Sequence, residues 1–418
     1  MKIFYPFVEM QRLAKNADDQ KNRLNRDIVD ASKDSRAPLW IDSILRRCGI
    51  HLNGSNPIDI KINNPDIYKK VITRWSLGLG ESYMDGDWDC EQLDEAFNRL
   101  LRLDVDQLAL GVTLTRSGWD IARTRLFNLQ SKSRSRIVGT VHYDIGNDLF
   151  ERMLDPHMIY SCGYWESAKD LAEAQEHKLK MICEKLDLRP GEKLLEIGCG
   201  WGGLAAYAAK HYNVQVLGIT ISQEQQRLAQ TRCAGLPVQI ELMDYRELNG
   251  QFDKIVSVGM FEHVGNRNYR GYFKQAFQLL KDDGLFLLHS IGSNITTHAT
   301  DPWINKYIFP NGKIPSPIEI AKNIDQLFLI EDWHNFGQDY DKTLMSWHDN
   351  FEQSWPSLCS NYDQKFYRMW KYYLLSSAGY FRSRQGQLWQ IVLSKRSKRS
   401  TYRSCRMKNF NGSNCDLI

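Results

Sequence analysis

Apolar residues in the second half of the chain change between a helical and a strand-like spacing. Leu179, Ile182, Cys183 and Leu186 recur on one helical face, which predicts a helix that ends at Pro190-Gly191. Short apolar runs then predict strands over 193–198, 214–220, 238–244, 253–259 and 284–291, with helical segments over 201–211, 222–233 and 267–281. This alternation is typical of a parallel, doubly wound sheet, which a strand over 388–393 would close.

The N-terminal part has a different pattern. Three glycines among the twelve residues between Trp75 and Trp88 predict a turn-rich segment. A helix should follow, because Leu93, Phe97 and Leu100 lie on one face. We expect a small, mostly helical domain over 37–105, preceded by a loosely ordered extension over 1–36.

Basic residues dominate two further segments. In the predicted linker 106–139, apolar residues interleave with arginines and lysines, and Asp120 is the only acid between 116 and 136. Such a segment either lies on an anionic membrane surface or is a connector with a solvated charged face. Residues 397–418 carry basic residues with no acid before Asp416, and we expect a flexible tail. The catalytic domain would occupy 140–396.

Composition narrows the class of protein. The net charge of the 418 residues is only +4, which does not favour a nucleic-acid-binding protein. The nine cysteines are scattered without a C-x-x-C pair, so neither a disulfide framework nor a metal site is expected. No apolar run approaches the roughly 18 residues that span a bilayer. We expect a soluble protein of the cytoplasm.

The first strand of the predicted sheet runs into a glycine-rich turn. Glu196 is followed by Gly198, Gly200 and Gly203, which satisfy the dinucleotide pattern G-x-G-x-x-G. A nicotinamide-binding enzyme would need an acid about 20 residues on, but the second strand ends at Thr220 without one. An acid at Glu196 is instead typical of S-adenosylmethionine turns, where it meets the cationic methionine end of the cofactor. We therefore favour S-adenosylmethionine.

Two polar residues mark the ends of neighbouring strands. Glu262, next to His263, follows the fourth predicted strand, and His289 lies at the end of the fifth. The carboxyl ends of strands line the ligand crevice in open α/β sheets, so these residues are candidates for acid–base chemistry. A surface pair and an ordinary core histidine are the alternatives.

Several motifs together resemble the cyclopropane-fatty-acyl-phospholipid synthase family, which is related to the mycolic acid cyclopropane synthases. They comprise 141–150, 158–165, 196–203, 218–225, 260–265, 301–312 and 332–340, with 78–86 in the small domain. The resemblance extends over about residues 40–396. It implies an α/β fold with a Rossmann-like class I methyltransferase sheet and helices on both faces.

The resemblance also implies a reaction, in which the methyl group of S-adenosylmethionine is transferred to a cis double bond of a phospholipid acyl chain. A proton is then lost to a bound bicarbonate and a cyclopropane ring closes. Bicarbonate ligands would be Glu262, His289, Tyr340, Cys162 and the backbone of Ile291. Cofactor contacts would come from Tyr160, Ser161, Glu196, Gly198, Cys199, Gly200, Gly202, Gly203, Thr220, Gln225, Asp244 and Tyr245.

One position departs from the family pattern. Ser377 stands where relatives commonly have a cysteine that was once proposed as catalytic. A serine has no thiolate, so we favour the bicarbonate base and interpret Ser377 as a pocket residue.

The resemblance implies a phospholipid bilayer with unsaturated acyl chains as partner, a homodimer, and peripheral attachment to the inner face of the membrane. Two alternatives remain: a methyltransferase that acts on a small amine or phenol, and a non-catalytic lipid-binding protein.

Overall fold

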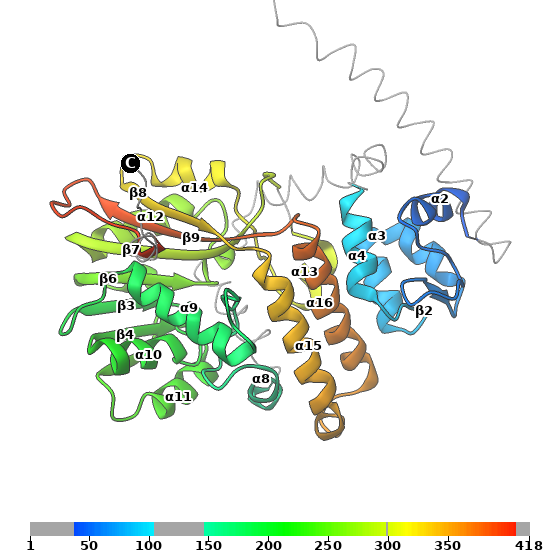
Figure 1. The fold of residues 1–418 in the computed structure, drawn as a ribbon, viewed down its shortest axis with the longest axis horizontal. Coiled ribbons are helices and arrows are strands. Elements are labelled where there is room, and N and C mark those ends of the chain that lie inside the picture. Colours follow the sequence, from blue (N-terminus) through cyan, green and yellow to red (C-terminus); the bar gives the residue numbers. More distant parts are fainter. Residues whose placement is uncertain (1–36, 104–145, 298–299, 407–418) are drawn as a thin grey trace, which may run out of the picture. The chain divides into compact units, whose positions relative to one another are not determined.

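The computed structural model describes residues 37–103, 146–297 and 300–406, which form two compact units. The larger unit contains 146–297, 309–358 and 386–406, and the smaller contains 37–103, 300–308 and 359–385. Each unit is described by itself below (Figure 1).

The larger unit is built on a seven-stranded sheet with the order β5-β4-β3-β6-β7-β9-β8. Five strands are parallel, and β9 and β8 complete the sheet in antiparallel pairing. The strands are β3 (Lys193–Ile197), β4 (Gln215–Thr220), β5 (Val238–Leu242), β6 (Phe252–Val258), β7 (Leu280–Gly292), β8 (Phe328–Asn335) and β9 (Gln387–Lys395).

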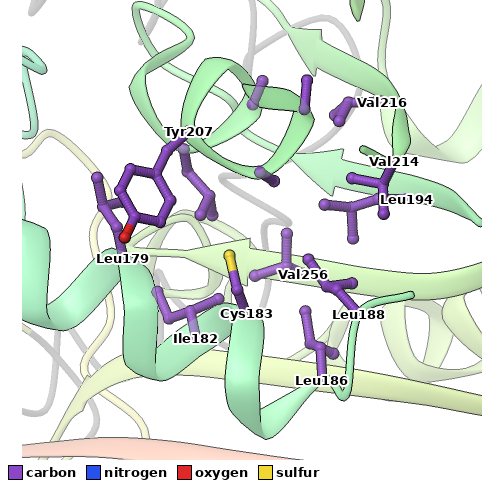
Figure 2. Packing of buried hydrophobic residues seen from close by; sticks show 14 of the residues in the cluster. Leu179, Ile182, Cys183, Leu186, Leu188, Leu194, Tyr207, Val214, Val216 and Val256 are labelled. Atoms are coloured by element: carbon purple, nitrogen blue, oxygen red, sulfur yellow. The ribbon is translucent and has the colours of Figure 1, made fainter. Parts of the chain in front are cut away.

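Helices cover both faces of this sheet. One apolar cluster joins alternate residues of the central strands, such as Leu194 and Val256, to α9 (Leu171–Lys185), α10 (Gly203–Tyr212) and α11 (Gln223–Arg232). Figure 2 shows Leu179, Ile182 and Cys183 of α9 within this cluster. The intervening strand residues pack on the other face against α12 (Tyr269–Leu279) and α14 (Pro317–Ile324). Because the central strands are apolar on both faces, each strand is buried between two helical layers.

The remaining helices of the larger unit are α8 (Asn147–Met153) and α15 (Asp339–Leu358), which pack on each other, and the short 3₁₀ helices η1 (Tyr245–Glu247) and η2 (Phe261–His263). Within the described ranges, every helix is too short or too polar to cross a bilayer.

The predicted α/β fold is confirmed, with one strand that the pattern did not reveal. Strand β8 lies at the edge of the sheet, where Leu329 and Ile330 are each 45% exposed. An edge strand is covered on few sides, so its residues do not form the continuous apolar run that marks the central strands.

The smaller unit contains segments from distant parts of the sequence. It consists of α2 (Leu39–Arg47), β1 (Lys61–Ile62), α3 (Asp66–Met84), β2 (Trp88–Asp89), α4 (Leu93–Arg102), α13 (Pro302–Tyr307) and α16 (Gln364–Arg382). The ring of Tyr372 on α16 lies 5.4 Å from that of Tyr83, 5.5 Å from that of Phe97 and 4.6 Å from that of Trp303. The compact units are therefore divided differently from the predicted domains 37–105 and 140–396, because this aromatic packing joins α13 and α16 to the N-terminal helices.

The segment predicted as turn-rich is helical. Helix α3 continues through it to Met84, with one non-helical residue at Trp75 (φ 51°). Gly80 lies against the indole of Trp303, and a Cβ atom there would come within 2.4 Å of Trp303 Cδ1. Glycine thus serves close helix packing here and not a turn.

The predicted flexible tail is ordered in its first part. Tyr402 packs on the cluster shown in Figure 2, and Lys398 donates to the carbonyl of Asp283 at 2.9 Å. Arg406 forms an ion pair with Asp332. Apolar burial and ion pairing hold residues 397–406 on the larger unit. The extension 1–36, the whole of the linker 106–139 and residues 407–418 lie outside the described residues.

Candidate active site

The predicted glycine-rich turn lies between β3 and α10, and its backbone has a conformation that glycine favours. Gly198, Gly200 and Gly202 have φ values of 82°, 54° and 81°, a region that side chains disfavour. A Cβ atom on Gly203 would lie 2.2 Å from the carbonyl oxygen of His157. Gly203 therefore lets the start of α10 approach the chain at residues 157–159.

A cavity of about 200 Å³ opens at this turn, at the carboxyl ends of the parallel strands. Every predicted cofactor-binding residue lines it except Gly202, which caps α10 beside the sulfur of Cys233. Their individual roles in binding remain predictions.

Polar groups at the end of β4 form one wall of the cavity. The hydroxyl of Thr220 donates to Gln225 Oε1 at 2.8 Å, and Ser222 caps α11 by accepting from the amide of Gln225. This pair of bonds fixes the carboxamide of Gln225 at the cavity wall.

Another wall is formed by the segment after β5. Arg246 Nε donates to Asp244 Oδ1 at 2.8 Å, and the guanidinium lies 5.5 Å from the ring centre of Tyr245. The Tyr245 ring packs on Tyr272 at 5.2 Å. A carboxylate next to an aromatic ring suits a nucleoside, which offers hydroxyl and amino donors and a flat base.

The third wall carries a buried carboxyl group, Glu196, and a buried amine, Lys178. Burial raises the pKa of Glu196 to about 8, although the charge of Lys178 opposes this shift. Burial lowers the pKa of Lys178 to about 8, and its ammonium donates to Ser161 Oγ at 2.9 Å. Lys178 was not predicted, although it falls in phase with the apolar face of α9, an unusual place for a lysine.

Glu262 and His289, two of the predicted acid–base residues, lie on segments that are hydrogen-bonded to each other beside this cavity. The amide of Ile291 donates to Glu262 Oε1 at 2.7 Å, and Gly259, which lines the cavity, donates its amide to the carbonyl of His289 at 3.0 Å. Burial raises the pKa of Glu262 to about 7. The neighbouring His263 instead faces the cavity, where burial lowers its pKa to about 4. The side chains of the adjacent Glu262 and His263 therefore lie in different surroundings.

His289 is buried and neutral, because burial holds its pKa well below the ordinary value. Its Nδ1 lies 3.2 Å from Gln390 Nε2, an arrangement in which the amide donates to the ring. That bond leaves the proton on Nε2, which has no hydrogen-bond partner among the described residues.

Cys162 and Tyr340 come from two further segments of the same unit. Thr343 on α15 donates to Cys162 Sγ at 3.8 Å and accepts from the amide of Gly163 at 3.1 Å. Burial raises the pKa of the Cys162 thiol well above its ordinary value. Tyr340 is buried on the same helix as Thr343. Ser377 lies on α16 of the smaller unit, and its place in the site remains a prediction.

Aromatic rings connect the cavity to α15. The ring of Tyr160, which lines the cavity, lies 5.1 Å from Phe150 and 5.1 Å from Trp347. Trp347 lies 6.0 Å from Tyr340. These rings form a largely apolar path between the predicted cofactor contacts and the predicted ligands on α15. Trp347 lies outside the motifs named in the sequence analysis, and Phe150 ends the motif 141–150 but was not singled out as a site residue.

Comparison with known proteins identifies the family. Residues 130–391, more than half of the chain, match the family described as mycolic acid cyclopropane synthetase. The chain belongs to this family. Its 57% identity to the cyclopropane-fatty-acyl-phospholipid synthase of Escherichia coli strain K12 extends over 355 residues, 85% of this chain and 92% of that protein.

Solved structures of the mycolic acid cyclopropane synthetase family have the same fold. The cyclopropane synthase MmaA2 from Mycobacterium tuberculosis is 28% identical, with a TM-score of 0.60 over 64% of this chain and all of that chain. The mycolic acid cyclopropane synthase CmaA1, complexed with SAH and CTAB, is 29% identical, with a TM-score of 0.59 over 62% of this chain and 98% of that chain. A solved family member thus holds the product form of S-adenosylmethionine.

Proposed function

We propose that the chain is an S-adenosylmethionine-dependent methyltransferase that forms cyclopropane rings at cis double bonds in the acyl chains of membrane phospholipids. Identity of 57% along nearly the whole length of the E. coli cyclopropane-fatty-acyl-phospholipid synthase carries this proposal. The cavity at the glycine-rich turn supports it, because its walls offer the groups that a zwitterionic nucleoside needs.

S-Adenosylmethionine supplies an electrophilic methyl group on a positively charged sulfur atom. Glu196 on one wall and the Tyr245 ring on another would bind its two ends, and Gln225 would donate or accept at the ribose. Fixing the cofactor at both ends orients its methyl group, which matters because an alkene is a weak nucleophile.

The aromatic path would accommodate the acyl chain. Phe150 and Trp347 are fully buried, and the π faces of these rings and of Tyr160 would favour the positive charge that methyl addition places on the chain. Exclusion of water prevents capture of that charge as an alcohol.

Bicarbonate fits the remaining polar groups in part. Glu262 Oε2 and His289 Nε2 are buried without a hydrogen-bond partner among the described residues, so both have capacity for an anion with an acidic hydrogen. The amide of Ile291 is already used by Glu262, so its contribution would be a shared bond. Glu262, His289, Cys162 and Tyr340 would hold the anion, which supplies a base for the proton lost before ring closure.

The test is a lipid assay with the purified protein, S-adenosylmethionine and vesicles of unsaturated phospholipid. We expect one CH₂ to be added per converted chain, with loss of the double bond. Unchanged lipid together with methylation of soluble amines or phenols would favour the small-molecule methyltransferase. Unchanged lipid without any binding of S-adenosylhomocysteine in calorimetry would favour the non-catalytic lipid-binding protein.

Two further features of the proposal come from the family resemblance stated in the sequence analysis. We expect a homodimer, which sedimentation would detect, and peripheral attachment to phospholipid vesicles, which flotation would detect.

A further inference from the structure

Two polar residues one turn apart on α9 hold the segment that enters the cavity. Gln175 Nε2 donates to the carbonyl oxygen of Ser161 at 2.7 Å. Lys178 Nζ donates to Ser161 Oγ at 2.9 Å. Both residues are fully buried, and Ser161 and Lys178 both line the cavity.

Burial of a lysine in this position costs free energy unless its ammonium group interacts with a ligand or with another group of the protein. Lys178 is 1% exposed, and a buried ammonium loses its hydration. Among the described residues, no carboxylate oxygen lies within ion-pair distance of its Nζ atom. The nearby carboxylate of Asp155 is occupied by the amides of His157 and Ile159.

Lys185, seven residues further along the same helix, provides a contrast. It is equally buried, but its Nζ lies 3.6 Å from Asp332 Oδ2 and 3.0 Å from His334 Nδ1. Lys185 thus has a carboxylate partner within the protein. Within the part of the chain that the structure describes, the Ser161 hydroxyl is the one hydrogen-bond partner of Lys178 Nζ, so two of its three donors remain available at the cavity wall.

The group across this wall has the opposite character. Glu196 Oε2 is buried without a hydrogen-bond partner among the described residues, and the charge of Lys178 acts on its carboxyl group. A donor-rich cation and an acceptor-rich carboxyl on one wall match an amino-acid group, which offers a carboxylate and an ammonium.

We propose that Lys178, together with Ser161, binds the α-carboxylate of the methionine end of S-adenosylmethionine, while Glu196 binds its ammonium group. This inference rests on the methyltransferase function proposed above and adds the residue that distinguishes the complete cofactor from analogues without the carboxylate. Gln175 is a positioning residue in this arrangement, because it holds the Ser161 backbone against α9.

The test compares binding of S-adenosylhomocysteine with binding of its decarboxylated analogue, which lacks only the α-carboxylate, by calorimetry. We expect the unmodified protein to bind S-adenosylhomocysteine roughly 10- to 100-fold more tightly, the usual value of a charge-assisted bond. In Lys178→Met this preference should fall to about threefold or less, while affinity for the analogue stays nearly unchanged. Lys178→Arg should recover part of the preference.

Lys185→Met is the matched control, because it removes an equally buried lysine from α9 outside the cavity, and it should retain the full preference. Equal affinity of the unmodified protein for both ligands would overturn the inference without any variant, so misfolding of Lys178→Met does not prevent a decision. Parallel loss of both affinities in Lys178→Met would also overturn it. If the unmodified protein binds neither ligand, the methyltransferase function itself fails.

Discussion

Burial of single carboxyl groups shapes the chemistry of this site at the scale of the residue. Glu262 is 8% exposed, and burial raises its pKa from 4.5 to about 7. The hydrogen bond from the amide of Ile291 acts in the opposite direction, because it favours the ionised carboxylate. The group therefore holds a proton in the folded protein under conditions where the unfolded chain has lost it. A proton held at neutral pH lets Glu262 donate to an anion beside it.

This shift predicts a dependence of stability on pH. Below pH 4.5 Glu262 is protonated in both states, and its contribution is fully present; the contribution is lost as the pH rises through about 7. In Glu262→Gln, the fall in the free energy of unfolding between pH 5 and pH 8 should be smaller by about 2–3 kcal/mol. Urea unfolding at both values measures it.

Glu176→Gln is the control, because it makes the same change of side chain at an exposed position of α9. An unchanged fall in Glu262→Gln would mean that Glu262 is ionised in the folded protein at pH 5.

At the scale of the element, the start of α10 has no space for a side chain. A Cβ atom on Gly203 would lie 2.2 Å from the His157 oxygen and 2.5 Å from Ile159 Cδ1. Gly203→Ala should therefore lower the free energy of unfolding by about 1–3 kcal/mol and weaken the binding of S-adenosylhomocysteine, since the turn must shift. Thermal unfolding and calorimetry measure the two effects.

Gly271→Ala on α12 is the matched substitution in open space. It should be neutral or stabilise by up to about 1 kcal/mol, because alanine favours a helix. If both variants behaved alike, close packing at Gly203 would not be the reason for its glycine.

Elements with a strong period were predictable, and those defined by tertiary packing were not. The spacing of apolar residues is sufficient to predict strands β3, β4 and β6 and the buried face of α9. Several residues of strand β8 are exposed, so its apolar residues do not recur with a clear spacing. Lys178 did leave a signal, a charge in phase with an apolar helix face, but only the cavity shows why a charge is tolerated there.

At the scale of the whole molecule, each of the two compact units is built from segments that are not contiguous in the sequence. The motif around Asp301–Gly312 resembles the family in one continuous run, yet Trp303 packs its indole against Met84 and Gly80 of α3 in the smaller unit. Motif similarity carries no information about such packing, because the partners lie more than 200 residues apart. Glu196, Glu262 and His289 could be placed near one edge of the sheet from the sequence, because the carboxyl ends of parallel strands converge there; their roles remain predictions.

Membrane attachment belongs to this scale, and the basic linker 106–139 is the candidate surface by its sequence. Replacing Arg123, Arg125, Lys132 and Arg134 with glutamate should weaken binding to anionic phospholipid vesicles strongly, since each basic residue near such a surface contributes about 1 kcal/mol. Affinity for S-adenosylhomocysteine should not change. Vesicle co-sedimentation and calorimetry measure the two quantities.

The control carries the same change of charge at exposed positions of the larger unit, Lys169, Lys180, Lys210 and Lys274. If the two variants lose equal vesicle affinity, net charge is responsible and the linker is a connector with a solvated face.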